Sequence, residues 1–200
     1  MGGGSSSEDA GARERRLHEV VAAAQAFDAQ RVADTVIWRL DLAPADAVLE
    51  LGCGSGRTLM RVASRVPRGF VAAVEPSELM LRHARLRARG LERSGRLRLV
   101  HGSTADLSAL AEARFDKAFG IHLAPLLREP RHELAEIRRV LRPGGRLLLG
   151  YRPAGESSSR GAAFPAARLE ALLVEGGFRD VRTERTIEAG PLLAFTRATR

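Results

Sequence analysis

The chain has 200 residues, of which 44% are hydrophobic and 28% charged, a composition that fits one domain with a core of ordinary size. It holds no apolar stretch of the about 18 residues that a membrane span needs, and no charged segment followed by an apolar one marks a secretion signal. A single cysteine excludes an intrachain disulfide and a cysteine-only zinc site, and no cluster of His and Asp suggests a catalytic metal. We therefore expect a cytoplasmic protein without a membrane partner or a metal.

The formal net charge is +8, and seven arginines gather between Arg82 and Arg98. Such a cluster is typical of a nucleic-acid-binding surface. However, Lys117 is the only lysine beside 31 arginines, a skew typical of nucleotide bias across a genome. Only 4% of the residues are aromatic, so side chains on which bases could stack are scarce. The sequence argues against a nucleic-acid partner without excluding one.

The first 42 residues divide into a tail and a helical segment. Residues 1–12 are rich in Gly and Ser and have no periodic apolar pattern, which predicts a disordered tail. Apolar residues then recur at helical spacing through residues 13–42, which predicts two helices before the first strand. We expect residues 13–200 to form a single domain.

Residues 48–58 are the most informative segment, because an apolar strand runs there into a glycine loop. The loop glycines stand at alternate positions, with Cys53 among them: Gly52, Gly54 and Gly56. Glycines let the backbone turn sharply and let a ligand approach its N–H groups, and a following helix directs its positive end to the same place. A dinucleotide fingerprint would need a glycine where Arg57 stands. Glu50, just before the loop, repels phosphates and suits a cation such as an ammonium group.

A second acid stands at the end of the next apolar run. Glu75 follows residues 70–74 and lies 19 positions after Gly56, a distance that fits one helix and one strand. A carboxylate at the end of the second strand of a βαβ unit can accept hydrogen bonds from both hydroxyls of an adenosine ribose. The alternative is a solvated acid beside Ser77 at the start of a helix.

Later segments continue the alternation of strands and helices. Strands ending near His101 and before His122 are followed by an amphipathic helix that Pro143, Gly144 and Gly145 stop, and then by an apolar strand. Residues 152–163 predict a surface loop, residues 164–175 a helix, and residues 178–186 and 192–196 two final strands.

With these residues in view, the glycine loop and Glu50 resemble the E/D-x-G-x-G-x-G element of class I S-adenosylmethionine-dependent methyltransferases. Residues 139–145 resemble the R-V-L-x-P-G-G element of the same family, so the resemblance covers about residues 45–151. It implies an α/β fold, a doubly wound Rossmann-like sheet of seven strands in the order 3-2-1-4-5-7-6 with an antiparallel last strand. Residues 13–42 would supply N-terminal cover helices, 45–151 the cofactor-binding core, and 164–200 a C-terminal helix and hairpin.

The resemblance also implies S-adenosyl-L-methionine as the cofactor. It places Glu50 near the methionine amino group, the three loop glycines beside the amino-acid and ribose portions, and Glu75 on the ribose hydroxyls. The other residues assigned to cofactor binding are Cys53, Pro76, Ser103, Thr104 and Gly120. The family often has an aspartate directly after the glycine of the third strand, whereas this chain has Ser103 there and Asp106 three residues later. The contact to adenine therefore stays open.

We expect a methyltransferase that acts on oxygen, nitrogen or carbon of a small-molecule acceptor. His122 stands just past the fourth strand, where ligands lie in this architecture, and is the candidate catalytic base. The alternative is a histidine that packs on the cofactor or caps a loop. An RNA or protein methyltransferase and a cofactor-binding module without turnover also stay open, and Arg57 and Glu50 disfavour an NAD-dependent oxidoreductase. The sequence does not identify the acceptor or the oligomeric state.

Overall fold

The computed structural model describes residues 29–123, 127–151, 165–186 and 193–200. Its strands are β1 (Ala47–Leu51), β2 (Phe70–Glu75), β3 (Leu97–His101), β4 (Phe115–Ile121), β5 (Leu141–Tyr151), β6 (Arg179–Thr186) and β7 (Leu193–Thr199). Its helices are α2 (Ala29–Leu40), α3 (Arg57–Arg65), α4 (Glu78–Arg93), α5 (Pro130–Val140) and α6 (Ala166–Glu175). Helix α2 is the second predicted N-terminal helix, whereas the first helix, the tail and the loop at 152–163 lie outside the described residues.

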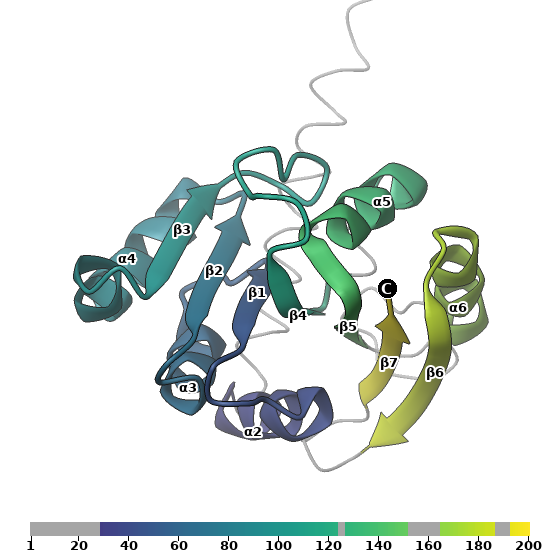
Figure 1. The fold of residues 1–200 in the computed structure, drawn as a ribbon, viewed down its shortest axis with the longest axis horizontal. Helices are drawn as coiled ribbons and strands as arrows, with labels where there is room; N and C mark the ends of the chain where they lie inside the picture. Colours follow the sequence, from purple (N-terminus) through teal and green to yellow (C-terminus); the bar gives the residue numbers. More distant parts are fainter. Residues whose placement is uncertain (1–28, 124–126, 152–164, 187–192) are drawn as a thin grey trace, which may run out of the picture.

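The strands form one seven-stranded sheet in the order β3-β2-β1-β4-β5-β7-β6, which can be followed across Figure 1. Strands β1 to β5 pair in parallel, and β7 runs antiparallel between β5 and β6. The predicted order and the antiparallel last strand are confirmed. Because parallel strands end at the same edge, the segments after β1, β2, β3 and β4 meet at one rim of the sheet.

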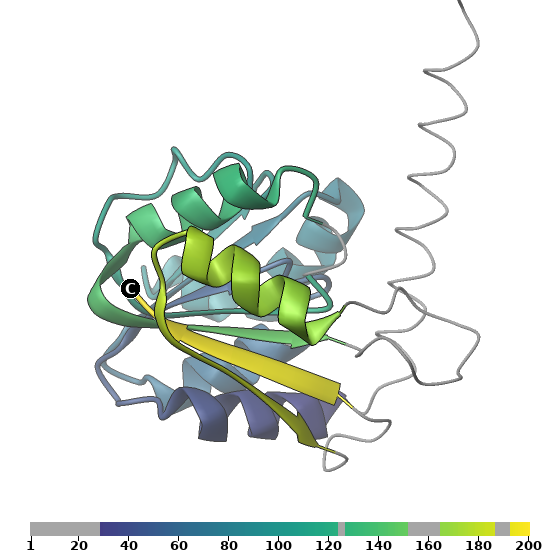
Figure 2. The same cartoon turned by 90° about the vertical axis from the view of Figure 1, so that its right-hand side faces the viewer.

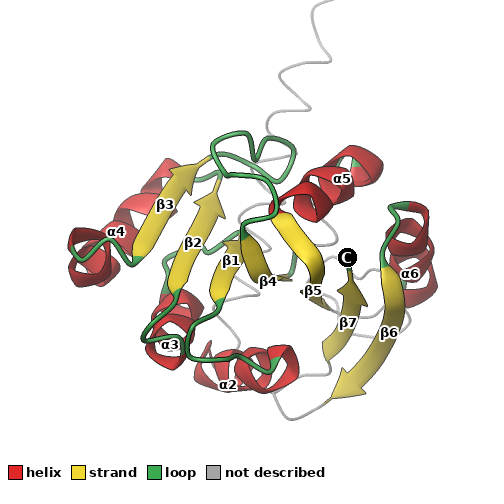
Figure 3. Cartoon of the chain, viewed as in Figure 1, coloured by secondary structure: helices red, strands yellow, loops and turns green. Residues whose placement is uncertain are grey.

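Helices cover both faces of this sheet, as Figure 3 shows by its colours. Helices α2, α3 and α4 share an apolar core with one face, and α5 and α6 share a second core with the other. In Figure 2, α2 lies on the opposite side of the sheet from α5 and α6. All five residues of β1 are buried, as expected for a central parallel strand. Glu50 is the one charged residue in that strand, which makes it the exception to an otherwise apolar run.

Two predicted boundaries differ from the structure. Helix α5 ends at Val140, before the Pro-Gly-Gly turn, because Leu141 already has extended backbone angles. The turn itself belongs to β5 and is tied to the chain end, since Gly144 N–H donates to the Arg200 carbonyl at 3.2 Å and Arg200 N–H donates to the Gly145 carbonyl at 2.9 Å. Strand β7 also continues to Thr199, beyond the predicted residue 196, because it pairs with β5 as far as Arg146.

No helix within the described ranges is both long and apolar enough to cross a bilayer. The same part of the chain contains no group of three or more His, Cys, Asp and Glu residues arranged to hold a metal ion.

Candidate cofactor site

The loop between β1 and α3 has a backbone that only glycine adopts easily. Gly52, Gly54 and Gly56 have φ angles of +74, +52 and +77 degrees, all in the left-handed region. The loop is fixed to β2, because the N–H groups of Gly52 and Cys53 both donate to the Val74 carbonyl, at 2.8 and 3.3 Å. The alternating glycines in the sequence thus correspond to three left-handed residues in one short, anchored loop.

Gly56 lies against a neighbouring helix, whereas Gly52 and Gly54 have open space around them. A Cβ atom built on Gly56 would lie 3.1 Å from the Cβ of Ala84 in α4, so this glycine allows the loop and α4 to pack closely. A Cβ atom on Gly52 or Gly54 would have no heavy atom within 4 Å. The loop therefore has a packed side toward α4 and an open side above Gly52 and Gly54.

This difference predicts different costs for two alanine substitutions. Gly54→Ala should destabilise the fold by about 1 kcal/mol, because the left-handed conformation strains any residue with a Cβ. Gly56→Ala adds a steric conflict with Ala84 and should cost about 1–3 kcal/mol more. Urea unfolding of both variants measures the difference. Equal losses at the two positions would contradict the described packing of the loop.

Glu75 lies at the end of β2 with its carboxylate turned into the glycine loop. One carboxylate oxygen accepts a hydrogen bond from Gly54 N–H at 2.8 Å and the other from Ser77 N–H at 2.9 Å. The residue is 6% exposed, and burial raises its pKa, while those two N–H groups and the nearby His101 act in the opposite direction. His101 also contacts the Pro76 carbonyl through Nε2 at 3.0 Å, which requires Nε2 to be the donor because a carbonyl can only accept.

Glu50 lies on the neighbouring strand and is 4% exposed. Its Oε2 atom is buried and has no hydrogen-bond partner among the described residues. Burial, followed by repulsion from Glu75, raises the pKa of Glu50 well above its usual value. The structure therefore brings the two predicted acids to the same rim, and one of them holds a buried oxygen that no described group satisfies.

Cys53 lies in the same loop, close enough to both acids for their charges to act on its thiol. Its side chain is 7% exposed, and burial and the charges of Glu50 and Glu75 raise the pKa of its thiol. A thiol in this environment stays protonated at neutral pH and is a poor nucleophile. Cys53 is therefore a small buried side chain of the loop.

The segment after β3 holds two of the predicted residues in different surroundings. Ser103 is exposed, and its hydroxyl accepts a hydrogen bond from Ala105 N–H at 3.3 Å. Thr104 is 6% exposed, and its hydroxyl donates to the carboxylate of Glu133 in α5. Asp106 accepts from Ser108 N–H at 3.0 Å, and hydrogen bonds from the Ser108 side chain and then from this N–H lower the pKa of Asp106. Thr104 is thus directed to the protein interior, and Ser103 is the one with an accessible hydroxyl.

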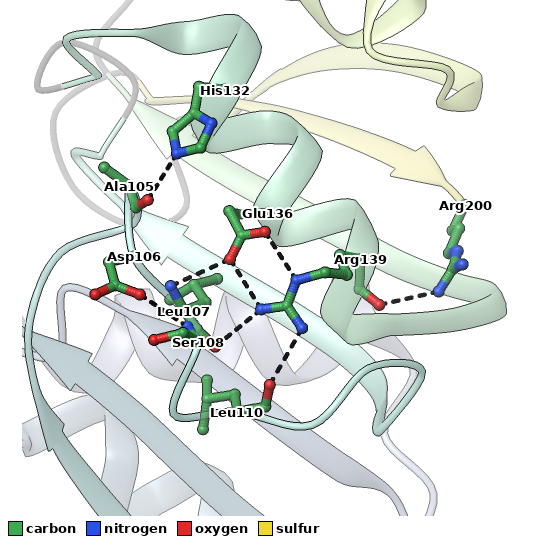
Figure 4. A network of polar contacts seen from close by, with 9 residues as sticks. All are labelled: Ala105, Asp106, Leu107, Ser108, Leu110, His132, Glu136, Arg139 and Arg200. Atoms are coloured by element: carbon green, nitrogen blue, oxygen red, sulfur yellow. Dashed lines mark hydrogen bonds and ion pairs between the residues drawn. The ribbon is translucent and has the colours of Figure 1, made fainter.

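Helix α5 holds this segment through side chains that the sequence analysis did not single out (Figure 4). Glu136 accepts from Leu107 N–H at 3.3 Å, while Arg139 donates to the carbonyls of Leu107 at 3.0 Å and Leu110 at 3.3 Å. Arg139 and Glu136 also pair with each other at 2.8 Å. Their spacing of three residues on a helix was a visible signal for the pair, but nothing in the sequence indicated which loop it would bind.

Gly120 and His122 lie where β4 reaches the rim. A Cβ atom on Gly120 would come within 2.9 Å of a Leu123 methyl group and 3.1 Å of the Leu51 carbonyl, so glycine permits close packing there. His122 is half-buried and has a φ of +60 degrees, a conformation that few residues with a Cβ adopt. Its N–H donates to the Gly150 carbonyl at 2.6 Å, which fixes the backbone turn to β5. The predicted place of His122, just past β4, is confirmed.

Comparisons with known proteins agree with this arrangement. Residues 48–145 match the family described as a methyltransferase domain. The chain is 36% identical over 113 residues to the ubiquinone/menaquinone biosynthesis C-methyltransferase UbiE of Paracoccus denitrificans, covering 54% of this chain and 44% of UbiE. It is 31% identical over 120 residues to an O-methyltransferase of Pyrenophora dematioidea, covering 60% of this chain and 44% of that protein. The chain thus spans less than half the length of these two relatives.

The fold has a close counterpart among solved structures. A SAM-dependent methyltransferase from Aquifex aeolicus superimposes with a TM-score of 0.71 at 22% identity, over 86% of this chain and 89% of that one. The matched family covers the glycine loop, both acids and the Pro-Gly-Gly turn, and the sheet order is the one that the resemblance implied. Residues 48–145 therefore match a methyltransferase domain, and the chain has the fold of a SAM-dependent methyltransferase.

Proposed function

We propose that this protein transfers a methyl group from S-adenosylmethionine to a small-molecule acceptor. The observation that carries the proposal is the buried Oε2 of Glu50, which lacks a hydrogen-bond partner among the described residues and lies at the rim that Glu75 also reaches. A buried carboxylate oxygen needs a donor or a cation, and the ammonium group of the cofactor's methionine portion is both. The open side of the loop above Gly52 and Gly54 leaves room for a ligand to approach.

The remaining parts of the cofactor fit neighbouring residues. Glu75 uses one acceptor position on each oxygen for the N–H groups of Gly54 and Ser77, and a carboxylate has further lone pairs for two ribose hydroxyls. The exposed hydroxyl of Ser103 is suited to the adenine amino group, whereas Thr104 is engaged by Glu133. Cys53, Pro76 and Gly120 would line the site without donating a polar side-chain group to it. We assign the polar contacts to Glu50, Glu75 and Ser103.

In the proposed reaction the main task of the protein is to align the acceptor with the methyl group of the cofactor. S-adenosylmethionine supplies a methyl group on a positively charged sulfur, from which an acceptor can displace it in line. The protein would orient the acceptor and exclude water. His122 would accept the acceptor's proton if the attacking group is a hydroxyl or an acidic carbon. The names of the two relatives, an O-methyltransferase and a quinone C-methyltransferase, favour acceptors of these two kinds.

Incubating the protein with methyl-labelled S-adenosylmethionine and a cell extract tests this proposal. We expect label in the low-molecular-weight fraction, and we expect His122→Ala to lower kcat by about 100-fold while the KM for the cofactor changes little. Label found in RNA or in protein would contradict a small-molecule acceptor. Binding of S-adenosylhomocysteine without transfer to any fraction would favour a cofactor-binding module without turnover.

A further inference from the structure

The excess of positive over negative charge in this protein comes from one stretch of the chain. Residues 57–100 contain 11 arginines and three glutamates, a net charge of +8, which equals the formal net charge of all 200 residues. The other residues carry 21 basic and 21 acidic side chains and are neutral as a set. A nucleotide bias across a genome would raise the arginine content everywhere, but it does not explain why this one stretch has only three acids beside its 11 arginines.

The structure shows where these charges lie on α4. Leu81, Ala84 and Ala88 are buried against the sheet. On the side toward α3, Arg87 donates a hydrogen bond to the Ser55 carbonyl in the glycine loop. The other arginines of the helix recur at helical spacing on the opposite flank, and all are exposed: Arg82, Arg85, Arg89 and Arg93. We call these four residues the basic stripe.

The basic stripe faces outward at the edge of the molecule. Helix α4 and β3 form the outermost pair of elements on this side (Figure 1), and β3 is the last strand of the sheet. Arg89 and Arg93 make no hydrogen bond or ion pair with any described residue, whereas Arg82 and Arg85 have only loose contacts with Glu78 at 3.6 Å and Glu92 at 4.0 Å. Such exposed pairs contribute about 0–1 kcal/mol, so all four guanidinium groups are available to a partner.

We propose that the basic stripe is a docking surface for a double-stranded nucleic acid, bound through its phosphates. The stripe extends over about 16 Å of helix, which corresponds to about five phosphates of one strand. Guanidinium groups bind phosphate oxygens in pairs of parallel hydrogen bonds, and an all-arginine stripe suits that contact. Residues 57–100 contain a single aromatic residue, Phe70, so they offer no series of rings for unpaired bases. The stripe therefore suits a duplex backbone.

Two other partners fit the stripe less well. A helix that binds at a membrane surface inserts a whole apolar face, but the apolar face of α4 is used inside the protein, and only Leu79 and Leu86 are exposed large hydrophobic residues on this helix. A protein interface usually contains aromatic anchors at its centre, and the stripe has none.

The docking surface is separate from the proposed methyl-transfer site. Glu75 and Ser77 lie just before the first turn of α4, at the rim, and the stripe runs away from them, from Arg82 in the second turn to Arg93 at the far end of the helix. We therefore expect a docked duplex to position the enzyme and not to serve as its methyl acceptor. This inference does not depend on the identity of the methyl acceptor.

Fluorescence anisotropy with a labelled DNA duplex of about 20 base pairs, two helical turns, tests the proposal on the full chain. The test variant is Arg85→Gln, Arg89→Gln, Arg93→Gln, and the control variant removes three exposed arginines from α5 and β6, Arg138→Gln, Arg179→Gln, Arg182→Gln. The slope of log K against log salt should become shallower by about 0.9 for each arginine removed from the stripe. The control should keep the wild-type slope, and both variants should bind S-adenosylhomocysteine like the wild type.

Three results would overturn the proposal. The first is an absence of duplex binding by the wild type at about 50 mM salt, where phosphate contacts are strongest in the usual range. The second is an equally shallow salt slope in the control variant, which would mean that duplex binding depends on net charge alone and not on the stripe. The third is tighter, stripe-dependent binding to vesicles of anionic lipid than to the duplex, which would assign the surface to a membrane.

Discussion

Replacing Glu75 by glutamine should weaken the binding of S-adenosylhomocysteine by about 10- to 100-fold, because each hydrogen bond from a ribose hydroxyl to a charged carboxylate contributes about 1.5–3 kcal/mol. Glutamine keeps the size of the side chain and one oxygen that can accept from Gly54 or Ser77 N–H. The loop should therefore stay near its present conformation. Isothermal titration calorimetry measures the change in affinity, and circular dichroism checks the fold.

Glu78→Gln is the matched control, because Glu78 lies three residues further on, is exposed, and pairs loosely with Arg82. It removes the same charge from the same region without touching the rim. We expect the control to bind like the wild type. An unchanged affinity in Glu75→Gln, or an equal loss in both variants, would remove Glu75 from the proposed site.

Replacing Glu50 by glutamine should make the protein more stable at neutral pH and should also weaken its binding of the cofactor. Burial and Glu75 raise the pKa of Glu50, so the folded state binds the proton more tightly than the unfolded state does. Stability linked to this group is then fully present below the unfolded pKa and is lost as the pH rises through the folded pKa. Glutamine carries no charge and therefore does not lose this stability. At pH values above the pKa of Glu50 in the folded protein, the free energy of unfolding of the variant should exceed that of the wild type by about 1–3 kcal/mol, the cost of an unsatisfied buried polar group.

Urea unfolding across pH tests this prediction. The stability of the Glu50→Gln variant should exceed that of the wild type at neutral and alkaline pH, and the two curves should meet near pH 4, about the unfolded pKa of a glutamate. Glu112→Gln, an exposed acid without a hydrogen bond to any described residue, is the control and should follow the wild type. A Glu50→Gln variant that is less stable at every pH would mean that the carboxylate has a partner in the folded state.

The rim was predictable from the sequence because its determinants are local. The glycine positions follow from the left-handed backbone of the loop, Glu50 is the last residue but one of the apolar strand β1, and Glu75 ends β2. The sheet order, including the antiparallel last strand, came from the family resemblance and not from the residues alone. The place of His122 after β4 was visible in the same way.

Contacts between distant segments were not predictable. The clamp of Glu136 and Arg139 on the segment after β3 joins residues about thirty positions apart, as does the bond from Thr104 to Glu133. The Pro-Gly-Gly turn predicted a helix end, but its place within β5 depends on hydrogen bonds to the chain end at Arg200. The burial of Glu50 also depends on packing that no single segment encodes.

The most direct test is the proton balance when S-adenosylhomocysteine binds, measured by calorimetry at mildly acidic pH in buffers of different ionisation enthalpy. If Glu50 pairs with the ligand's ammonium group, binding favours its charged form, and the wild type should release a proton that the Glu50→Gln variant does not release. Binding without proton release, equal in the two proteins, would contradict the assignment of Glu50. Failure of the wild type to bind this ligand would contradict the whole account of the site.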